Sequence, residues 1–177
     1  MTVEEAEDDG AGRFQALDAI YARYQETEKI PGLAFGVVRD GTIAYAKGLG
    51  IVSVETKAAV GPETFFRIAS MTKVVTAIGI LLLRDRGKLA LDAPLKSFLS
   101  GFGDERLPTR DSRPIVLQDL LTHVGGFVTD DPWGDRQLAM PAEAFDRMLA
   151  EGQNFAQSPR IAFEYSNLSY SLLGRVI

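Results

Sequence analysis

The chain has 177 residues, of which 46% are hydrophobic and 24% are charged, so it holds enough apolar material for the core of one domain. Its net charge of −5 and the lack of a basic cluster argue against nucleic acid as a partner. The absence of cysteine excludes disulfides, thiol catalysis and cysteine-based zinc sites, and the single histidine is His123.

The N-terminal stretch 1–12 is acidic and polar, and we predict that it is a disordered tail. It lacks the basic and apolar regions of a signal peptide. The longest apolar run, 77–83, is far too short to cross a bilayer. We therefore expect a cytoplasmic protein without a membrane partner.

A helix followed by a hairpin is predicted next. Residues 13–29 carry apolar side chains at the spacing of an amphipathic helix. Two strand-like runs follow, 33–39 and 42–48, and they are joined by Asp40 and Gly41. An Asp-Gly pair between two such runs is a strong signal for a tight hairpin turn.

The second strand of this hairpin is expected to have two different faces. Alternation along it places Ile43, Tyr45 and Lys47 on one side of the sheet. A two-stranded hairpin alone is marginally stable in water. We therefore expect it to pair with further strands or to be covered by a partner.

Helices are predicted for much of the remaining chain. The run 71–86 is apolar nearly all round in its middle, which indicates burial on several sides. Shorter helices are expected at 115–122 and 141–151, and a last helix begins at Leu168 and continues to Ile177. The entrances of the first and last of these helices carry the residues on which a functional interpretation depends.

Ser70 and Lys73 lie at the entrance of the helix at 71–86, one turn apart, so their side chains leave the same face. A serine with a lysine beside it has the arrangement of a nucleophile with its base, and partial burial would make the lysine usable in that role. The structural alternative is that Ser70 caps the helix and Lys73 lies on the surface.

Tyr165 and Asn167 form a second pattern, Tyr-x-Asn, at the entrance of the last helix. In the functional interpretation Tyr165 is an acid or base beside the ammonium of Lys73, and Asn167 donates a hydrogen bond to Lys73 or to the substrate. In the structural alternative Tyr165 is a core residue and Asn167 caps the last helix.

A triad of Ser70, His123 and Asp119 is a further option, because Asp119 lies four residues before His123. Side chains of one short turn point side by side, however, whereas the carboxylate of a triad must approach the far nitrogen of the ring. We therefore expect His123 to pack or to form a hydrogen bond at a turn. No serine lies in a Gly-x-Ser-x-Gly elbow.

An acidic loop contains Asp130, Asp131 and Asp135. It lacks the alternating ligands and the glycine of a calcium-binding loop, and no histidine is near enough to serve as a further ligand. We interpret it as a solvated loop and expect neither a metal nor a cofactor.

Four stretches carry a resemblance to a known family. They are the Ser-x-x-Lys motif at 70–73, the Leu-Leu-Thr-His-Val-Gly-Gly run at 120–126, the Tyr-x-Asn motif at 165–167 and the hairpin at 36–50. In this order and approximate spacing they resemble the serine β-lactamase-related hydrolases. This group holds class C-type β-lactamases, D-alanyl-D-alanine carboxypeptidases and β-lactamase-like esterases.

The resemblance implies an α+β fold of the β-lactamase/transpeptidase type, with an antiparallel sheet, flanking helices and a helical subdomain. Residues 13–177 would form an incomplete domain, with helix and hairpin at 13–61 and a mostly helical part with the motifs at 62–177. The family's later strand, with a Lys/His-Thr/Ser-Gly motif that supplies a second oxyanion donor, is not found in these residues. We therefore expect the N-terminal portion of such a hydrolase, truncated before the C-terminal strands. Loss of one oxyanion donor costs on the order of 10²–10³ in rate, so this chain alone is expected to have little or no activity.

The resemblance also implies a reaction by acyl transfer. Ser70 would attack a carbonyl, Lys73 and Tyr165 would move protons, and Asn167 would bind the substrate. The expected substrate is a small ester or amide, and the absence of a visible signal peptide favours a carboxylesterase-like enzyme over a β-lactamase or a D-Ala-D-Ala carboxypeptidase, which stay open.

Two alternatives remain at this point. The chain is either such a hydrolase or a non-catalytic binding protein on the same scaffold, completed by a second copy as a homo-oligomer or by a missing C-terminal segment. Trp133 and Phe127 either line the acyl side of the cleft or simply pack within their loop.

Overall fold

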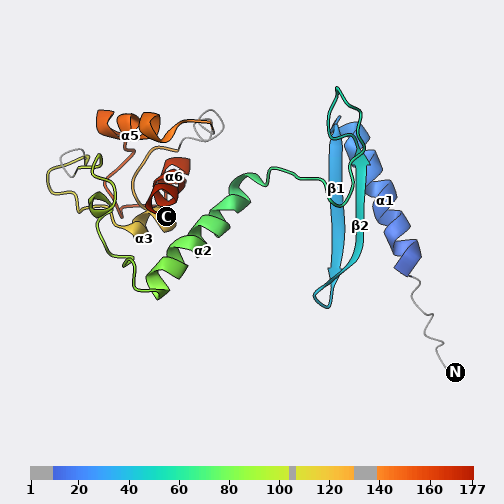
Figure 1. Ribbon diagram of the computed structural model, residues 1–177, viewed down its shortest axis with the longest axis horizontal. Coiled ribbons are helices and arrows are strands. Elements are labelled where there is room, and N and C mark those ends of the chain that lie inside the picture. Colours follow the sequence, from blue (N-terminus) through green and yellow to red (C-terminus); the bar gives the residue numbers. More distant parts are fainter. Residues whose placement is uncertain (1–9, 104–106, 130–138) are drawn as a thin grey trace. The chain divides into compact units, whose positions relative to one another are not determined.

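The computed structural model describes residues 10–103, 107–129 and 139–177, and the chain divides into two compact units, Met1–Arg67 and Ile68–Ile177 (Figure 1). Residues 1–9 of the predicted tail lie outside the described residues. Residues 10–12 belong to a helix, which therefore begins three residues earlier than expected. Every helix in the described part of the chain is too short or too polar to cross a lipid bilayer.

The first unit consists of a helix and a hairpin: α1 (Gly10–Thr27), β1 (Gly32–Arg39) and β2 (Thr42–Gly50), with the two strands antiparallel. At the turn, Asp40 and Gly41 have φ of 51° and 75°. A two-residue type I′ turn requires this left-handed region at both central residues. The predicted hairpin is thus confirmed.

Helix α1 lies along one face of the hairpin (Figure 1). Aromatic rings form the contact: Phe14 stacks on Tyr45 with ring centroids 4.6 Å apart, and Tyr21 stacks on Phe35 at 4.2 Å. Stacked pairs of this kind are worth about 0.5–1.5 kcal/mol beyond the area that they bury. The helix is therefore held to the sheet by a short aromatic row.

Three polar side chains meet at the same contact between α1 and β2. Asp18 accepts hydrogen bonds from the hydroxyl of Tyr45, at 2.6 Å, and from the ammonium of Lys47. The carboxylate thereby joins two residues of one strand to the helix.

A β-bulge changes the predicted faces of β2. Val37 pairs with Tyr45 but Val38 pairs with Ile43, so Ala44 is an extra residue with no partner across the ladder. A bulge of this kind interrupts the alternation of side chains. Ile43 consequently lies on the side away from α1 and is 74% exposed, while Tyr45 faces the helix. The expectation that Ile43 and Tyr45 share a face is wrong.

The second unit is mainly helical. Its elements are the 3₁₀ turn η1 (Ala69–Met71), α2 (Thr72–Asp85), the 3₁₀ turn η2 (Leu95–Ser97), α3 (Leu117–Leu121), α5 (Ala142–Glu151) and α6 (Asn167–Val176). Helix α6 packs against both α2 and α3 (Figure 1). The centre of the core consists of fully buried apolar side chains, among them Ile80, Leu95, Leu117, Leu120, Leu172 and Leu173.

Helix α2 packs one face on α6 within the second unit. Its residue Ile80 is fully buried in the core. The expected burial of its other apolar positions stays a prediction.

Candidate active site

Ser70 lies in the 3₁₀ turn η1, directly before α2, and is exposed. The preceding residue, Ala69, has φ of 45°, a left-handed conformation that is uncommon for a residue with a Cβ. The N-cap of α2 is Met71, so Ser70 does not cap this helix. Its Oγ instead lies 2.6 Å from the hydroxyl oxygen of Tyr165, and either group can be the donor.

Lys73 lies in the first turn of α2 and is half-buried. Its Nζ donates hydrogen bonds to the hydroxyl oxygen of Tyr165 at 2.6 Å, to Oδ1 of Asn167 at 2.6 Å and to Oγ of Ser70 at 3.3 Å. An ammonium group has three donors, and these three oxygens account for all of them. The interpretation of Lys73 as a surface residue is therefore wrong.

Tyr165 and Asn167 reach this cluster from the entrance of α6. The N-cap is Ser166, whose Oγ accepts a hydrogen bond from the backbone N–H of Ser169 at 3.1 Å. Asn167 is the first residue of the helix and not its cap. Because an ammonium can only donate, Asn167 accepts the hydrogen bond from Lys73, which reverses the direction expected from the sequence.

The structure thus brings together all four predicted site residues, Ser70, Lys73, Tyr165 and Asn167, within the second unit. Residues of the two motifs, more than ninety positions apart in the sequence, meet because α6 packs on α2. The hydroxyl of Ser70 contacts both an amine and a phenol, which are groups that can exchange protons with it.

The three residues of the alternative triad are not arranged as a triad. Nδ1 of His123 accepts a hydrogen bond from the backbone N–H of Ser166 at 3.1 Å. Burial lowers the pKa of His123 below its ordinary value of 6.5, and the charge of Lys73 lowers it further, so the ring is neutral at pH 7. The triad hypothesis is wrong, and the expectation that His123 forms a hydrogen bond at a turn is confirmed.

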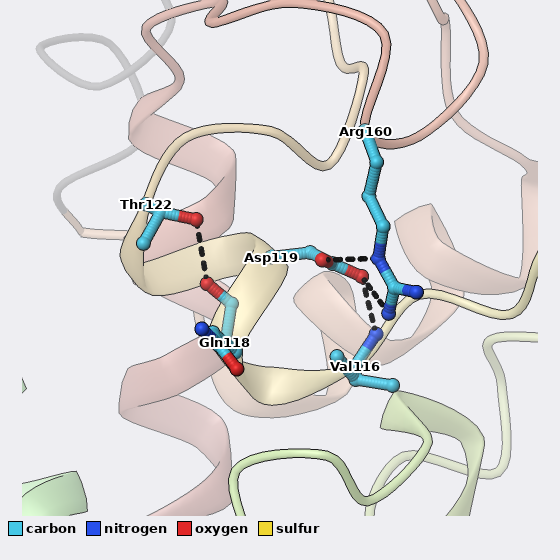
Figure 2. Close-up of polar contacts among 5 residues, drawn as sticks. All are labelled: Val116, Gln118, Asp119, Thr122 and Arg160. Atoms are coloured by element: carbon cyan, nitrogen blue, oxygen red, sulfur yellow. Dashed lines mark hydrogen bonds and ion pairs between the residues drawn. The ribbon is translucent and has the colours of Figure 1, made fainter.

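Asp119 has partners of its own, which Figure 2 shows. Its buried carboxylate accepts two hydrogen bonds from the guanidinium of Arg160, at 2.7 and 3.0 Å, and one from the backbone N–H of Val116 at 3.0 Å. Asp119 therefore caps the start of α3 and ties the segment around Arg160 to it. Sequence reasoning missed this pair, because 41 residues separate its members and neither lies in a motif.

The remaining sequence predictions concern the loop after the turn at 122–126. Phe127 is 1% exposed and stacks on Phe155 with ring centroids 4.9 Å apart, so it packs in the core and does not line a cleft. Trp133 lies outside the described residues, as does the acidic loop of Asp130, Asp131 and Asp135.

Comparison with known proteins agrees with this geometry. The family model described as Beta-lactamase matches residues 17–177, and the chain belongs to this family. The fold is accordingly the α+β fold of the β-lactamases and transpeptidases, which confirms the fold expected from the resemblance.

Three relatives place the chain within the family. The Esterase EstB of Burkholderia gladioli is 34% identical over 118 residues, which is 67% of this chain and 30% of the relative. The Protein flp of Staphylococcus aureus (strain COL) is 29% identical over 164 residues, 92% of this chain and 32% of the relative. The octameric penicillin-binding protein homologue from Pyrococcus abyssi superposes with a TM-score of 0.74 at 28% identity, covering 92% of this chain and 38% of that one. The chain thus spans about a third of the length of the curated relatives that it matches.

Proposed function

We propose that the protein is a serine hydrolase that acts through an acyl-enzyme on Ser70. The observation that carries this proposal is the position of the Ser70 hydroxyl, 2.6 Å from the hydroxyl oxygen of Tyr165 and 3.3 Å from Nζ of Lys73. A serine hydroxyl is a weak nucleophile until a neighbouring group takes its proton. Here the hydroxyl of Tyr165 and the side-chain nitrogen of Lys73 both lie within hydrogen-bonding distance of Ser70.

The proposed proton path runs from Ser70 to the pair of Lys73 and Tyr165. The ammonium of Lys73 lies 2.6 Å from the phenol oxygen, and a positive charge at this distance favours the phenolate form. The phenolate would take the proton of Ser70 as Oγ attacks the substrate carbonyl, and the phenol would return it to the leaving group. Water would then release the acyl group by the reverse sequence.

Asn167 has a supporting role in this proposal. Its Oδ1 accepts a hydrogen bond from Nζ of Lys73 at 2.6 Å. This neutral acceptor directs the lysine without fixing its charge. Asn167 would therefore keep Lys73 in place.

We propose a small ester as the substrate. The 34% identity to Esterase EstB supports this choice, because it is the highest identity among the relatives named above. β-Lactams and D-alanyl peptides stay as alternatives, since the same nucleophile and proton path serve all three and the pocket decides between them. The proposal concerns the whole protein, including whichever residues complete the pocket beside residues 13–177.

A second candidate is a binding protein that uses this scaffold without catalysis. The face of the hairpin away from α1 favours it, because Val38 and Ile43 are 69% and 74% exposed there and a partner or a second copy would cover them. The octameric state named for the Pyrococcus abyssi homologue is a precedent for assembly with further copies only.

Labelling with a fluorophosphonate separates the two candidates. The product of the complete native gene is treated with the probe, digested and mapped by mass spectrometry. The expected result is one modified peptide with the probe on Ser70 and no labelling of the Ser70→Ala variant. Labelling at another serine, or none, would contradict the proposed hydrolase. The rates at which the protein hydrolyses a p-nitrophenyl ester and a chromogenic cephalosporin are then compared, and the faster reaction indicates the preferred substrate class.

A further inference from the structure

The single histidine of the chain lies directly behind the candidate acid-base residue. The rings of His123 and Tyr165 stack with centroids 4.7 Å apart and planes inclined by 28°. The ring centroid of Tyr170, on α6, lies 5.1 Å away, and that of Phe163 lies 5.5 Å away in an edge-to-face contact. His123 is only 9% exposed, so its ring is enclosed by aromatic neighbours and is not available to a substrate.

His123 also holds the backbone on both sides of Tyr165. Its carbonyl oxygen accepts a hydrogen bond from the N–H of Glu164 at 2.8 Å. Its Nδ1 accepts one from the N–H of Ser166 at 3.1 Å. The residues before and after Tyr165 are thus both fixed to one residue, and the tyrosine ring between them rests on the imidazole.

The backbone of His123 is in a conformation that normally suits glycine. It follows the last turn of α3 with φ of 57°. The N–H of His123 bonds to the carbonyl of Leu120, and that of Val124 to the carbonyl of Asp119, which is the pattern of a Schellman motif. Glycine or asparagine is favoured at this position. A histidine in its place points to a role for the ring that offsets the backbone strain.

We propose that His123 is a positioning residue: its neutral ring accepts the Ser166 N–H and supports the Tyr165 ring, so that the Tyr165 hydroxyl meets Ser70 and Lys73. This inference rests on the proposed hydrolase function, because it assigns a purpose to the placement of Tyr165. His123 acts through Tyr165 and does not touch the reacting atoms itself.

The proposal implies a response to acid. When the imidazole is protonated, Nδ1 becomes a donor and faces the Ser166 N–H, which is also a donor, so the hydrogen bond is lost. The titratable groups around the ring are Lys73 on α2, Tyr165 before α6 and Tyr170 on α6, whereas the nearby carboxylate of Asp119 is occupied by Arg160.

Burial and the charge of Lys73 both disfavour the charged ring, so the pKa of His123 lies below its ordinary value of 6.5. The Ser166 hydrogen bond is therefore expected to persist at pH 7 and to break only at a pH below 6.5.

Two variants separate the hydrogen bond from the aromatic contact. His123→Asn keeps an acceptor near the position of Nδ1 and suits the left-handed backbone, but it removes the ring and cannot titrate. His123→Phe keeps an aromatic ring against Tyr165 but removes the acceptor. The product of the complete native gene is used, and the rate constant of fluorophosphonate labelling at Ser70 is measured from pH 4.5 to 8.

The expected result at pH 7.5 is a loss on the order of 10- to 100-fold for His123→Phe, because a small displacement of Tyr165 misaligns the proton transfer. His123→Asn should lose less than His123→Phe, because it keeps the acceptor for the Ser166 N–H and loses only the support of the Tyr165 ring. Its pH profile should also lack the part of the acid limb that comes from the titration of the histidine. Equal rates for wild type and His123→Phe, or equal losses in both variants, would overturn the proposal.

A second measurement does not depend on catalysis or on either variant. The ¹⁵N–¹H signal of Ser166 in the wild type should move with pH along the titration of His123, with a midpoint below pH 6.5. A Ser166 signal that does not follow this titration contradicts the inference. Labelling of Ser70 in the wild type is the separate check of the hydrolase function. If Ser70 is not labelled, the proposed function fails. If Ser70 is labelled and the His123 variants label at the wild-type rate, only the positioning role of His123 fails.

Discussion

A tyrosine and a lysine meet in each of the two units, around a carboxylate in the first unit and around a serine hydroxyl in the second. In the first unit Asp18 accepts hydrogen bonds from Lys47 and Tyr45. The hydrogen bond to Asp18 raises the pKa of Lys47 above 10.5 and that of Tyr45 above 10.0, and the same contacts, led by Lys47, lower the pKa of Asp18 below 3.8. Each group is thereby held in the protonation state that it already has at pH 7.

In the second unit the oxygens around the lysine are uncharged. The acceptors that the structure describes for Lys73 are the oxygens of Ser70, Tyr165 and Asn167. Without a carboxylate to fix its proton, a lysine beside a phenol and a serine can take part in proton exchange. Under the proposed function, a lysine and a tyrosine are structural beside the carboxylate of Asp18 and reactive beside the hydroxyl of Ser70.

The sharpest test of this contrast removes each lysine in turn. Lys73→Ala is expected to lower the rate of Ser70 labelling at pH 7 by about 10³-fold or more, since general acid-base groups contribute up to about 10⁴-fold. Lys47→Ala is the matched control and should leave that rate within about twofold. Circular dichroism checks that both variants keep their helices. Near-normal labelling of Lys73→Ala would remove the lysine from the mechanism.

The tyrosines form a second matched pair with a smaller expected effect. Tyr165→Phe removes the hydroxyl that lies 2.6 Å from Ser70 and should lower the labelling rate by about 10²-fold. Tyr45→Phe loses the hydrogen bond to Asp18 and should leave the rate unchanged. If the two variants behave alike, the contrast between the units does not hold for the phenols.

Asn167→Asp would place a carboxylate beside Lys73 and Tyr165, as Asp18 lies beside Lys47 and Tyr45 in the first unit. The new carboxylate would offset the positive charge beside the phenol and so disfavour the phenolate of Tyr165. The rate at pH 7 should therefore fall about tenfold, and the acid limb of the pH profile should move to higher pH. The control is Asn154→Asp, the same change at the other asparagine, which is exposed. An unshifted profile for Asn167→Asp would show that the charge of Lys73 does not limit the rate.

The smallest expected effect concerns acid stability in the first unit. Because the pKa of Asp18 is lowered in the folded state, its stabilising contribution is complete above the unfolded value of 3.8 and is lost as the pH falls through the folded value. A ¹³C titration of the Asp18 carboxyl should give a midpoint below 3.8 in the wild type and a midpoint nearer 3.8 in Lys47→Met. A wild-type midpoint at or above 3.8 would contradict the pairing.

The features that the sequence predicted correctly are local. The turn at Asp40 and Gly41 requires two adjacent residues in the left-handed region, and an Asp-Gly pair predicts such a turn. Ser70 and Lys73 share a face because one helical turn separates them. Each pattern needs only its own few residues, so no knowledge of the rest of the fold is required to find it.

The features that the sequence did not predict depend on partners far along the chain. The bulge at Ala44 follows from how β1 and β2 pair and reverses the face of Ile43. The pairing of Asp119 with Arg160 depends on the packing of a distant segment on α3. His123 was expected at a turn. Its hydrogen bonds to both neighbours of Tyr165 could not be foreseen, because Ser166 lies 43 positions further along the sequence.

The exposed pair of Val38 and Ile43 bears on how this protein can be handled. Two large apolar side chains, 69% and 74% exposed, stand side by side on a hairpin whose outer strand edges offer unpaired backbone groups. A surface of this kind favours strand-to-strand aggregation. A fragment limited to residues 10–67 is therefore expected to be poorly soluble. Ile43→Lys, which places a charge on that face, is the substitution we expect to improve its yield.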